Sequence, residues 1–127
     1  MQKAECRMQN KRDLKDRTKR FALLVIKMFS ELPKTTVAQV VGKQVLRSGT
    51  SVGANYREAD RARSTAEFVA KMGDCLKEID ESIYWFELLV DGGIVSGEEI
   101  NSLIKEANEL TAIFVTIINK AKKNSVQ

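Results

Sequence analysis

The chain has 127 residues, 43% of them hydrophobic and 30% charged, with a formal net charge of +4 and no histidine. This length indicates a single domain, and the lack of an apolar run of about 20 residues excludes a membrane-spanning helix. The charge is unevenly distributed, because residues 1–55 are basic and residues 56–90 are acidic. Such a division favours either nucleic-acid contact or head-to-tail packing of subunits.

Two features indicate a cytoplasmic protein with no membrane partner. The first residues, MQKAECRMQNKRDLKDR, carry charges but no apolar core, so they are not a secretory signal. The two cysteines are not expected to pair, since Cys75 falls on the apolar face of a helix and Cys6 lies near the N-terminus.

Residues 1–12 form a basic segment that we expect to be a mobile arm. The first helix is predicted from Asp13 to Leu32, where Pro33 ends it. Its main apolar stripe has a heptad-like spacing and consists of Leu14, Thr18, Phe21, Val25, Met28 and Leu32. A second apolar stripe consists of Ala22, Ile26 and Phe29.

The second helix is predicted to begin at Thr36, which forms a capping box with Gln39, and to end between Asp60 and Arg63. Its apolar face consists of Val37, Val41, Val45, Val52 and Ala59. A capping box of Ser64 and Glu67 begins the third helix, which ends at the sequence Asp-Gly-Gly of residues 91–93. The core line of this helix is Phe68, Met72, Cys75, Ile79, Ile83, Phe86 and Val90.

The fourth helix begins at a capping box of Ser96 and Glu99 and ends in the lysines near residue 123. Its inner face is Ile100, Leu103, Ala107, Leu110, Phe114, Ile117 and Ala121. Four long helices joined by short turns must pack antiparallel to their neighbours. The sequence therefore predicts an all-α, up-down-up-down four-helix bundle over residues 13–123, followed by a tail at 124–127.

Apolar residues are in surplus on the third helix. Ile83, Tyr84, Trp85 and Phe86 are consecutive, so they cannot all face one core, and Trp85 shares a stripe with Glu78, Glu81 and Leu88. Exposed apolar patches usually mark interfaces, so we expect a homo-oligomer. The alternative is that wide apolar faces only fill the core of the bundle.

A polar stripe runs along the second helix. It consists of Gln44, Arg47, Ser51, Asn55 and Glu58, at spacings that place all five on one helical face. We interpret this polar stripe as a helix–helix lock, with glutamates of the third helix as its partners. Arg47 also belongs to the neighbouring basic stripe, and the sequence leaves its role as a structural or a ligand-contacting residue open.

The basic stripe consists of Lys43, Arg47, Thr50, Ala54, Arg57 and Arg61. The start of the first helix adds a second group of cations, Lys11, Arg12, Lys15, Lys19 and Arg20. Clustered cations of this kind can contact nucleic-acid phosphates, and no base-reading motif accompanies them. The alternative is a charged face that is solvated or paired between subunits.

No catalytic, cofactor or metal site is complete. Residues 49–53, Gly-Thr-Ser-Val-Gly, match the G-x-S-x-G pattern, but the pattern needs a histidine and a strand-to-helix turn. We interpret its small residues as a site of close helix approach. A metal pair of Glu78 and Glu81 is disfavoured because carboxylate metal sites in helical bundles also use histidine. We therefore expect a protein that is not an enzyme.

Two segments carry a resemblance to a known family. Residues 44–59, QVLRSGTSVGANYREA, resemble the second-helix signature of bacterial four-helix bundle proteins related to the 23S rRNA intervening-sequence protein. The third helix is also similar, in Glu67-Phe68, Lys77-Glu78, Glu81, Tyr84-Trp85 and Leu88-Leu89. The departures are Gly53, where many relatives have proline, and Ala59, where many have glycine.

The resemblance implies several properties. Members of the family form homopentamers, and many are encoded within intervening sequences of ribosomal RNA genes. A similar pentameric bundle, the accessory variability determinant of diversity-generating retroelements, binds nucleic acid and partners a reverse transcriptase. By position, the resemblance implies that Gln44, Arg47, Ser51, Asn55, Glu58, Glu78, Glu81 and Trp85 are a structural signature.

These observations predict a non-enzymatic homopentameric bundle that binds RNA or DNA through its basic surface, either with an rRNA intervening sequence or beside a reverse transcriptase. The alternative is a protein-interaction scaffold without a nucleic-acid role.

Overall fold

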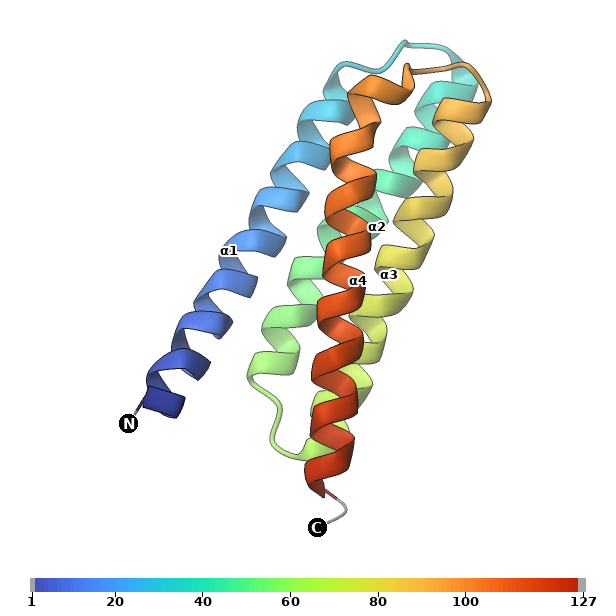
Figure 1. Cartoon of the computed structure of the whole chain (residues 1–127). Coiled ribbons are helices and arrows are strands. Elements are labelled where there is room, and N and C mark those ends of the chain that lie inside the picture. The colour runs from blue at the N-terminus through green and yellow to red at the C-terminus, as the bar shows by residue number, and fades with distance from the viewer. Residues whose placement is uncertain (1, 126–127) are drawn as a thin grey trace.

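The computed structural model describes the backbone of residues 2–125 and the side chains of residues 13–125. Within that part the chain forms four helices and no strand (Figure 1). They are α1 (Gln2–Ser30), α2 (Thr36–Asp60), α3 (Thr65–Asp91) and α4 (Gly97–Ser125). Consecutive helices run antiparallel, and the two ends of the chain lie at the same end of the molecule (Figure 1). The predicted all-α, up-down-up-down bundle is confirmed.

Two helix starts follow the expected chemistry. Ser64 Oγ accepts a hydrogen bond from the backbone N–H of Glu67 at 3.1 Å, and Glu67 Oε2 accepts one from the Arg63 N–H at 3.1 Å. At the start of α4, Ser96 Oγ accepts from the Glu99 N–H at 3.4 Å. These contacts satisfy backbone donors that have no partner inside the helix, so both capping residues are confirmed.

Other boundaries differ from the sequence prediction. Thr35, not Thr36, caps α2, because Thr35 has extended backbone and its Oγ1 accepts from the Ala38 N–H at 3.3 Å. The Gln39 side chain donates instead to the Pro33 carbonyl at 2.9 Å. α1 begins at Gln2 rather than near Asp13, since residues 2–12 contain no proline or glycine to interrupt it. The mobility of this basic arm stays a prediction. α4 extends to Ser125, into the segment expected to be a tail.

The core lies along the axis shared by all four helices. Phe21 packs edge-to-face on Phe86, and Tyr56 stacks on Phe114, each at a centroid distance of 6.4 Å. Most residues expected in the core are buried, but Val37 is 60% exposed. The buried line of α2 instead consists of Ala38, Gly42, Val45, Ser48, Gly49, Val52, Gly53, Tyr56 and Ala59. Val45, Val52 and Ala59 of this line were predicted, whereas the apolar face named from the sequence left out Ala38, Gly42 and Tyr56.

The glycines of α2 allow α1 to approach closely. A Cβ atom at Gly49 would lie 2.9 Å from Cγ2 of Val25, and a Cβ at Gly42 would lie 2.9 Å from Cδ2 of Phe29. Real Cβ atoms do not approach other atoms this closely, so a larger residue at either position would force the packed side chains of α1 to shift. The interpretation of residues 49–53 as a site of close helix approach is confirmed, and α2 continues without a break through Gly53.

The helices do not pack equally against one another. The α2–α3 interface is the most extensive and the α1–α4 interface the least. Figure 1 shows α1 diverging from the other helices toward its N-terminal end. A cavity of about 490 Å³ lies between α1 and α4, lined by Asp13, Leu14, Arg17, Ile113, Thr116 and Ile117 among others. The polar and basic stripes of α2 are therefore carried by the best-packed half of the bundle.

Candidate nucleic-acid interface

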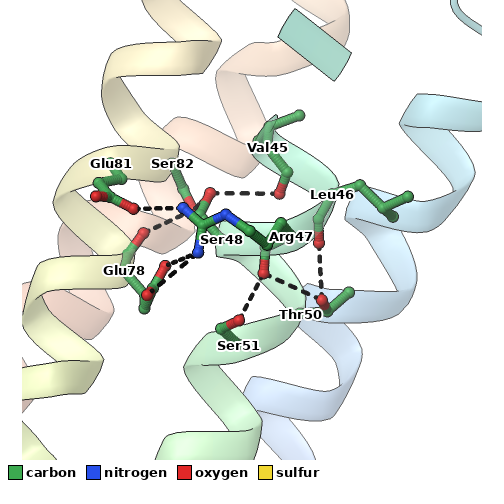
Figure 2. A network of polar contacts seen from close by, with 9 residues as sticks. All are labelled: Val45, Leu46, Arg47, Ser48, Thr50, Ser51, Glu78, Glu81 and Ser82. Atoms are coloured by element: carbon green, nitrogen blue, oxygen red, sulfur yellow. Dashed lines mark hydrogen bonds and ion pairs between the residues drawn. The ribbon is translucent and has the colours of Figure 1, made fainter. Parts of the chain in front are cut away.

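Arg47 of the polar stripe connects α2 to α3. Its guanidinium donates to the two carboxylate oxygens of Glu78 at 3.2 and 3.4 Å and to Glu81 at 2.7 Å (Figure 2). These bonds, led by the one to Glu81, raise the pKa of Arg47, and the same bond lowers the pKa of Glu81. Glu78 and Glu81 are one turn apart on α3, so a single planar guanidinium can reach both.

Beneath Arg47 lies a second polar contact between the same helices. The hydroxyl oxygens of Ser48 and Ser82 are 2.7 Å apart, and both side chains are fully buried. Ser82 also donates to the Glu78 carbonyl at 2.8 Å. Buried hydroxyls must find partners, so this pair constrains the register of α2 against α3. The sequence analysis did not identify it; the only available signal was a small polar residue at a core position of each helix.

The other members of the polar stripe contribute unequally to the α2–α3 contact. Glu58 forms an ion pair with Lys71 of α3 at 2.8 Å, and Ser51 donates to the Arg47 carbonyl at 2.7 Å. Asn55 is partly exposed and Gln44 is exposed. The lock therefore consists of Arg47 and Glu58 at the surface, above the buried serine pair.

Apart from Arg20, which is described below, four cations of the predicted site are exposed and have no ion pair within 4.0 Å among residues 13–125. They are Lys19, Lys43, Arg57 and Arg61. The last three lie on the basic stripe of α2, on the side away from the core. Arg47 differs from them because its charge is already engaged by two carboxylates.

Lys15 and Lys19 lie beside this stripe. Lys15 forms an ion pair with Asp60 at 3.1 Å, which places the start of the described part of α1 against the end of α2. Lys19 follows one turn later on the same side of α1. We call Lys15, Lys19, Lys43, Arg57 and Arg61 the α1–α2 basic face. The side chains of Lys11 and Arg12 lie outside the described part.

Arg20 does not belong to this face. It is exposed, and its charge helps to lower the pKa of Glu106 on α4, so it lies toward the opposite side of α1. There Arg17 donates to both oxygens of Glu106 at 2.7 Å and to Glu109 at 2.7 Å. The Arg17 bonds are the largest cause of the lowered Glu106 pKa. Sequence reasoning missed this clamp; its signal was two glutamates three positions apart on the facing helix.

α3 carries charge of the opposite sign to the basic face. Between Thr65 and Asp91 there are seven acidic residues and two lysines. The acidic residues are Glu67, Asp74, Glu78, Asp80, Glu81, Glu87 and Asp91. The charge division expected from the sequence thus corresponds to separate surfaces of the bundle.

An apolar patch borders the α2–α3 contact. Because these helices are antiparallel, the start of α2, with Val37 and Val40, and the last part of α3, with Tyr84 and Trp85, lie toward the same end of the bundle (Figure 1). Val37, Val40 and Tyr84 are each more than half exposed, and the Tyr84 and Trp85 rings are 5.0 Å apart. The Trp85 Nε1–H is buried and has no acceptor among residues 13–125. We call these four residues the Trp85 patch.

The described side chains give little support to a metal site or to a reactive cysteine. No cluster of three or more His, Cys, Asp or Glu residues suited to a metal ion occurs among them. Burial raises the pKa of the Cys75 thiol to about 12, and its Sγ contacts the Val52 carbonyl at 3.6 Å, so this cysteine is protonated and packs as a core residue. No helix in the described chain is both long and apolar enough to cross a membrane.

The geometry defines a class of protein: a small helical bundle whose basic and acidic surfaces lie on different helices. Comparison with known proteins identifies the family. Residues 10–116 match the family model of the 23S rRNA-intervening sequence protein, and the chain belongs to that family.

A solved structure is similar to this chain over most of its length. It is the crystal structure of a protein with unknown function from the S23 ribosomal protein family of Bacteroides thetaiotaomicron VPI-5482. The two share 37% identity and a TM-score of 0.78, over 83% of this chain and 97% of that one. No curated protein matches the chain. The resemblance seen in the second and third helices is therefore confirmed at the level of the family.

Proposed function

We propose that this chain is a non-enzymatic, cytoplasmic homo-oligomer that binds RNA or DNA through the α1–α2 basic face. One observation carries the proposal: Lys19, Lys43, Arg57 and Arg61 are exposed and form no ion pair within 4.0 Å among residues 13–125. Unpaired cations of this kind can bind phosphates and release the counterions condensed on a nucleic acid. The family is named for the 23S rRNA-intervening sequence, which makes RNA the first nucleic acid to test.

The proposed binding is independent of base sequence. Base recognition needs side chains that reach base edges, and lysines and arginines on a helical surface of this kind contact phosphates first. Affinity should therefore fall steeply with salt and change little between unrelated sequences of equal length and secondary structure.

The experiment is a salt titration of binding to a mixed pool of RNA and DNA. The variant Arg57→Glu/Arg61→Glu should weaken binding at low salt by at least about tenfold. The control is Lys77→Glu/Lys105→Glu, which changes the net charge equally at exposed positions of α3 and α4. Equal effects of the two variants would mean that net charge, not this face, governs binding. No binding at low salt by the folded protein would refute the proposal.

Self-association is the second part of the proposal. The Trp85 patch supports it, because Val37, Val40 and Tyr84 expose apolar side chains on two neighbouring helices. Exposed apolar side chains grouped near a tryptophan are frequent at interfaces. The resemblance to a family of homopentamers suggests five subunits.

Light scattering at micromolar concentration tests this part. A homopentamer should have five times the 14.3 kDa mass of the chain. Val40→Glu places a charge in the Trp85 patch and should reduce the mass, whereas Val115→Glu, at an exposed position of α4, should not. A monomeric parent protein would contradict the expectation.

The alternative function is a protein-interaction scaffold without a nucleic-acid role. The Trp85 patch and the acidic surface of α3 favour it, and a reverse transcriptase is one candidate partner that the resemblance suggests. A pull-down with and without nuclease separates the two functions, since partners retained after nuclease treatment support the scaffold. The genomic neighbourhood, an rRNA operon or a reverse transcriptase with a template repeat, would identify the process.

A further inference from the structure

We propose that the α1–α2 basic face binds the paired phosphate backbones of a duplex in preference to a single strand. This inference rests on the proposed function and adds the structural class of the nucleic acid. It follows from the arrangement of the cations, from what lies beside them, and from the location of the aromatic side chains.

The cations form two rows on neighbouring antiparallel helices. Lys43 and Arg61 are separated by about 27 Å along α2 at the rise of an α-helix. Lys15 and Lys19 lie across from the Arg57–Arg61 end of that row, as the Lys15–Asp60 contact shows. Packed helices lie about 8–10 Å apart, and the glycines of α2 hold these two close. Two parallel rows of cations at that separation can each follow one strand along a groove.

Exposed apolar side chains lie beside Lys15 and Lys19 on α1. One row on α1 has spacings of four, four and three and consists of Lys15, Lys19, Leu23 and Ile26. Leu23 is 53% exposed and Ile26 is 45% exposed. These side chains have no polar group with which to read an unpaired base, and a helical surface cannot fold around a flexible strand.

The basic face exposes no large aromatic side chain among the described residues, although partly buried Phe29 packs against Gly42 beside Lys43. Phe21, Tyr56, Phe86 and Phe114 are buried in the core. Phe29 and Phe68 are partly buried against it. Tyr84, the one exposed large aromatic among residues 13–125, belongs to acidic α3. Proteins that bind single strands obtain much of their affinity by stacking bases on aromatic rings. The basic face has no such platform, whereas a duplex presents phosphates without requiring one.

The experiment compares three ligands of equal length by fluorescence anisotropy at low salt: a mixed-sequence RNA duplex, the matching DNA duplex, and oligo(dT). The parent protein should bind at least one duplex about tenfold more tightly than oligo(dT). With four unpaired cations, the slope of log affinity against log salt should be about −3.6 for that duplex. The RNA and DNA arms show which duplex supplies the phosphates.

A gain-of-stacking variant provides a second readout. Leu23→Trp adds an aromatic surface at an exposed position of the basic face. It should raise affinity for oligo(dT) by about tenfold, the effect of stacking one base, and change duplex affinity by less than about twofold. Leu24→Trp is the control, because Leu24 is similarly exposed but lines a cavity toward α4.

The outcomes are distinguishable. The protein could bind oligo(dT) as tightly as either duplex, with a salt-dependence slope that the Arg57→Glu/Arg61→Glu variant reduces. That result would overturn the duplex preference and leave the proposed function standing. Failure of the folded protein to bind any of the three ligands at low salt would overturn both. Duplex binding unaffected by Arg57→Glu/Arg61→Glu would also overturn both, because it would place the site on another surface.

Discussion

Arg47→Met tests whether the signature arginine is structural. Methionine keeps the length and helix preference of the side chain but removes the guanidinium. The change deletes the 2.7 Å bond to Glu81 and the bonds to Glu78 at 3.2 and 3.4 Å. The Arg47 side chain is 51% exposed, and those of Glu81 and Glu78 are 36% and 15% exposed.

These exposures determine the size of the effect. The pair with Glu81 is largely solvated, so it contributes about 0.5 kcal/mol to the free energy of unfolding. Glu78 is mostly covered, and removing its cation costs about 1 kcal/mol. Together the loss should be about 1–2 kcal/mol, or about 3–8 °C in Tm for a chain of this size. Nucleic-acid affinity should stay within about twofold of the parent value.

The pH dependence adds an internal check. Arg47 holds the pKa of Glu81 below its ordinary value in the folded protein. The stabilisation from this pair is therefore complete above the unfolded glutamate pKa of about 4.3 and is lost as pH falls through the lower folded pKa. Urea unfolding at pH 7 and pH 3 should show a difference between Arg47→Met and the parent protein that shrinks at pH 3. Unchanged stability, with affinity reduced as far as in Arg57→Glu/Arg61→Glu, would refute the structural role.

Three further predictions concern the packing. Gly49→Ala should lower the free energy of unfolding by about 1–2 kcal/mol, because its Cβ would lie 2.9 Å from Val25. Gly73→Ala is the control, because a Cβ there would have no atom within 4 Å. It should raise the free energy of unfolding by about 0.5–1 kcal/mol in the same urea denaturation assay. Ser82→Ala should cost about 1 kcal/mol, and a thermodynamic cycle with Ser48→Ala should show a non-additive coupling. Arg17→Met should increase hydrogen exchange selectively in α1, because the Arg17 clamp joins α1 to α4. An increase in exchange that is uniform over the helices would contradict this role.

The fold was predictable because its signals are local. The capping residues Ser64 and Ser96, the turn at Gly93 and the helical spacing of large apolar residues each specify their own segment.

The site was only partly predictable. Its exposed cations could be assigned to one face of α2 by spacing, but which of them are engaged depends on carboxylates of other helices. Sequence spacing places Arg47 and Arg57 on one stripe, and the antiparallel packing of α3 shows that Arg47 is paired whereas Arg57 has no ion pair among residues 13–125.

The pairing of individual cations is what links the stability of this bundle to its proposed binding. Arg17 and Arg47 each join two carboxylates of a neighbouring helix, so a phosphate could recruit them only by displacing bonds that hold the bundle together. Lys43 and Arg57 break no ion pair within residues 13–125 when they bind. The proposed binding would therefore use different cations from those that hold the fold, although Lys43 and Arg47 are only about one turn apart on α2. Charge substitutions at the first pair should act mainly on unfolding, and those at the second mainly on salt-dependent affinity.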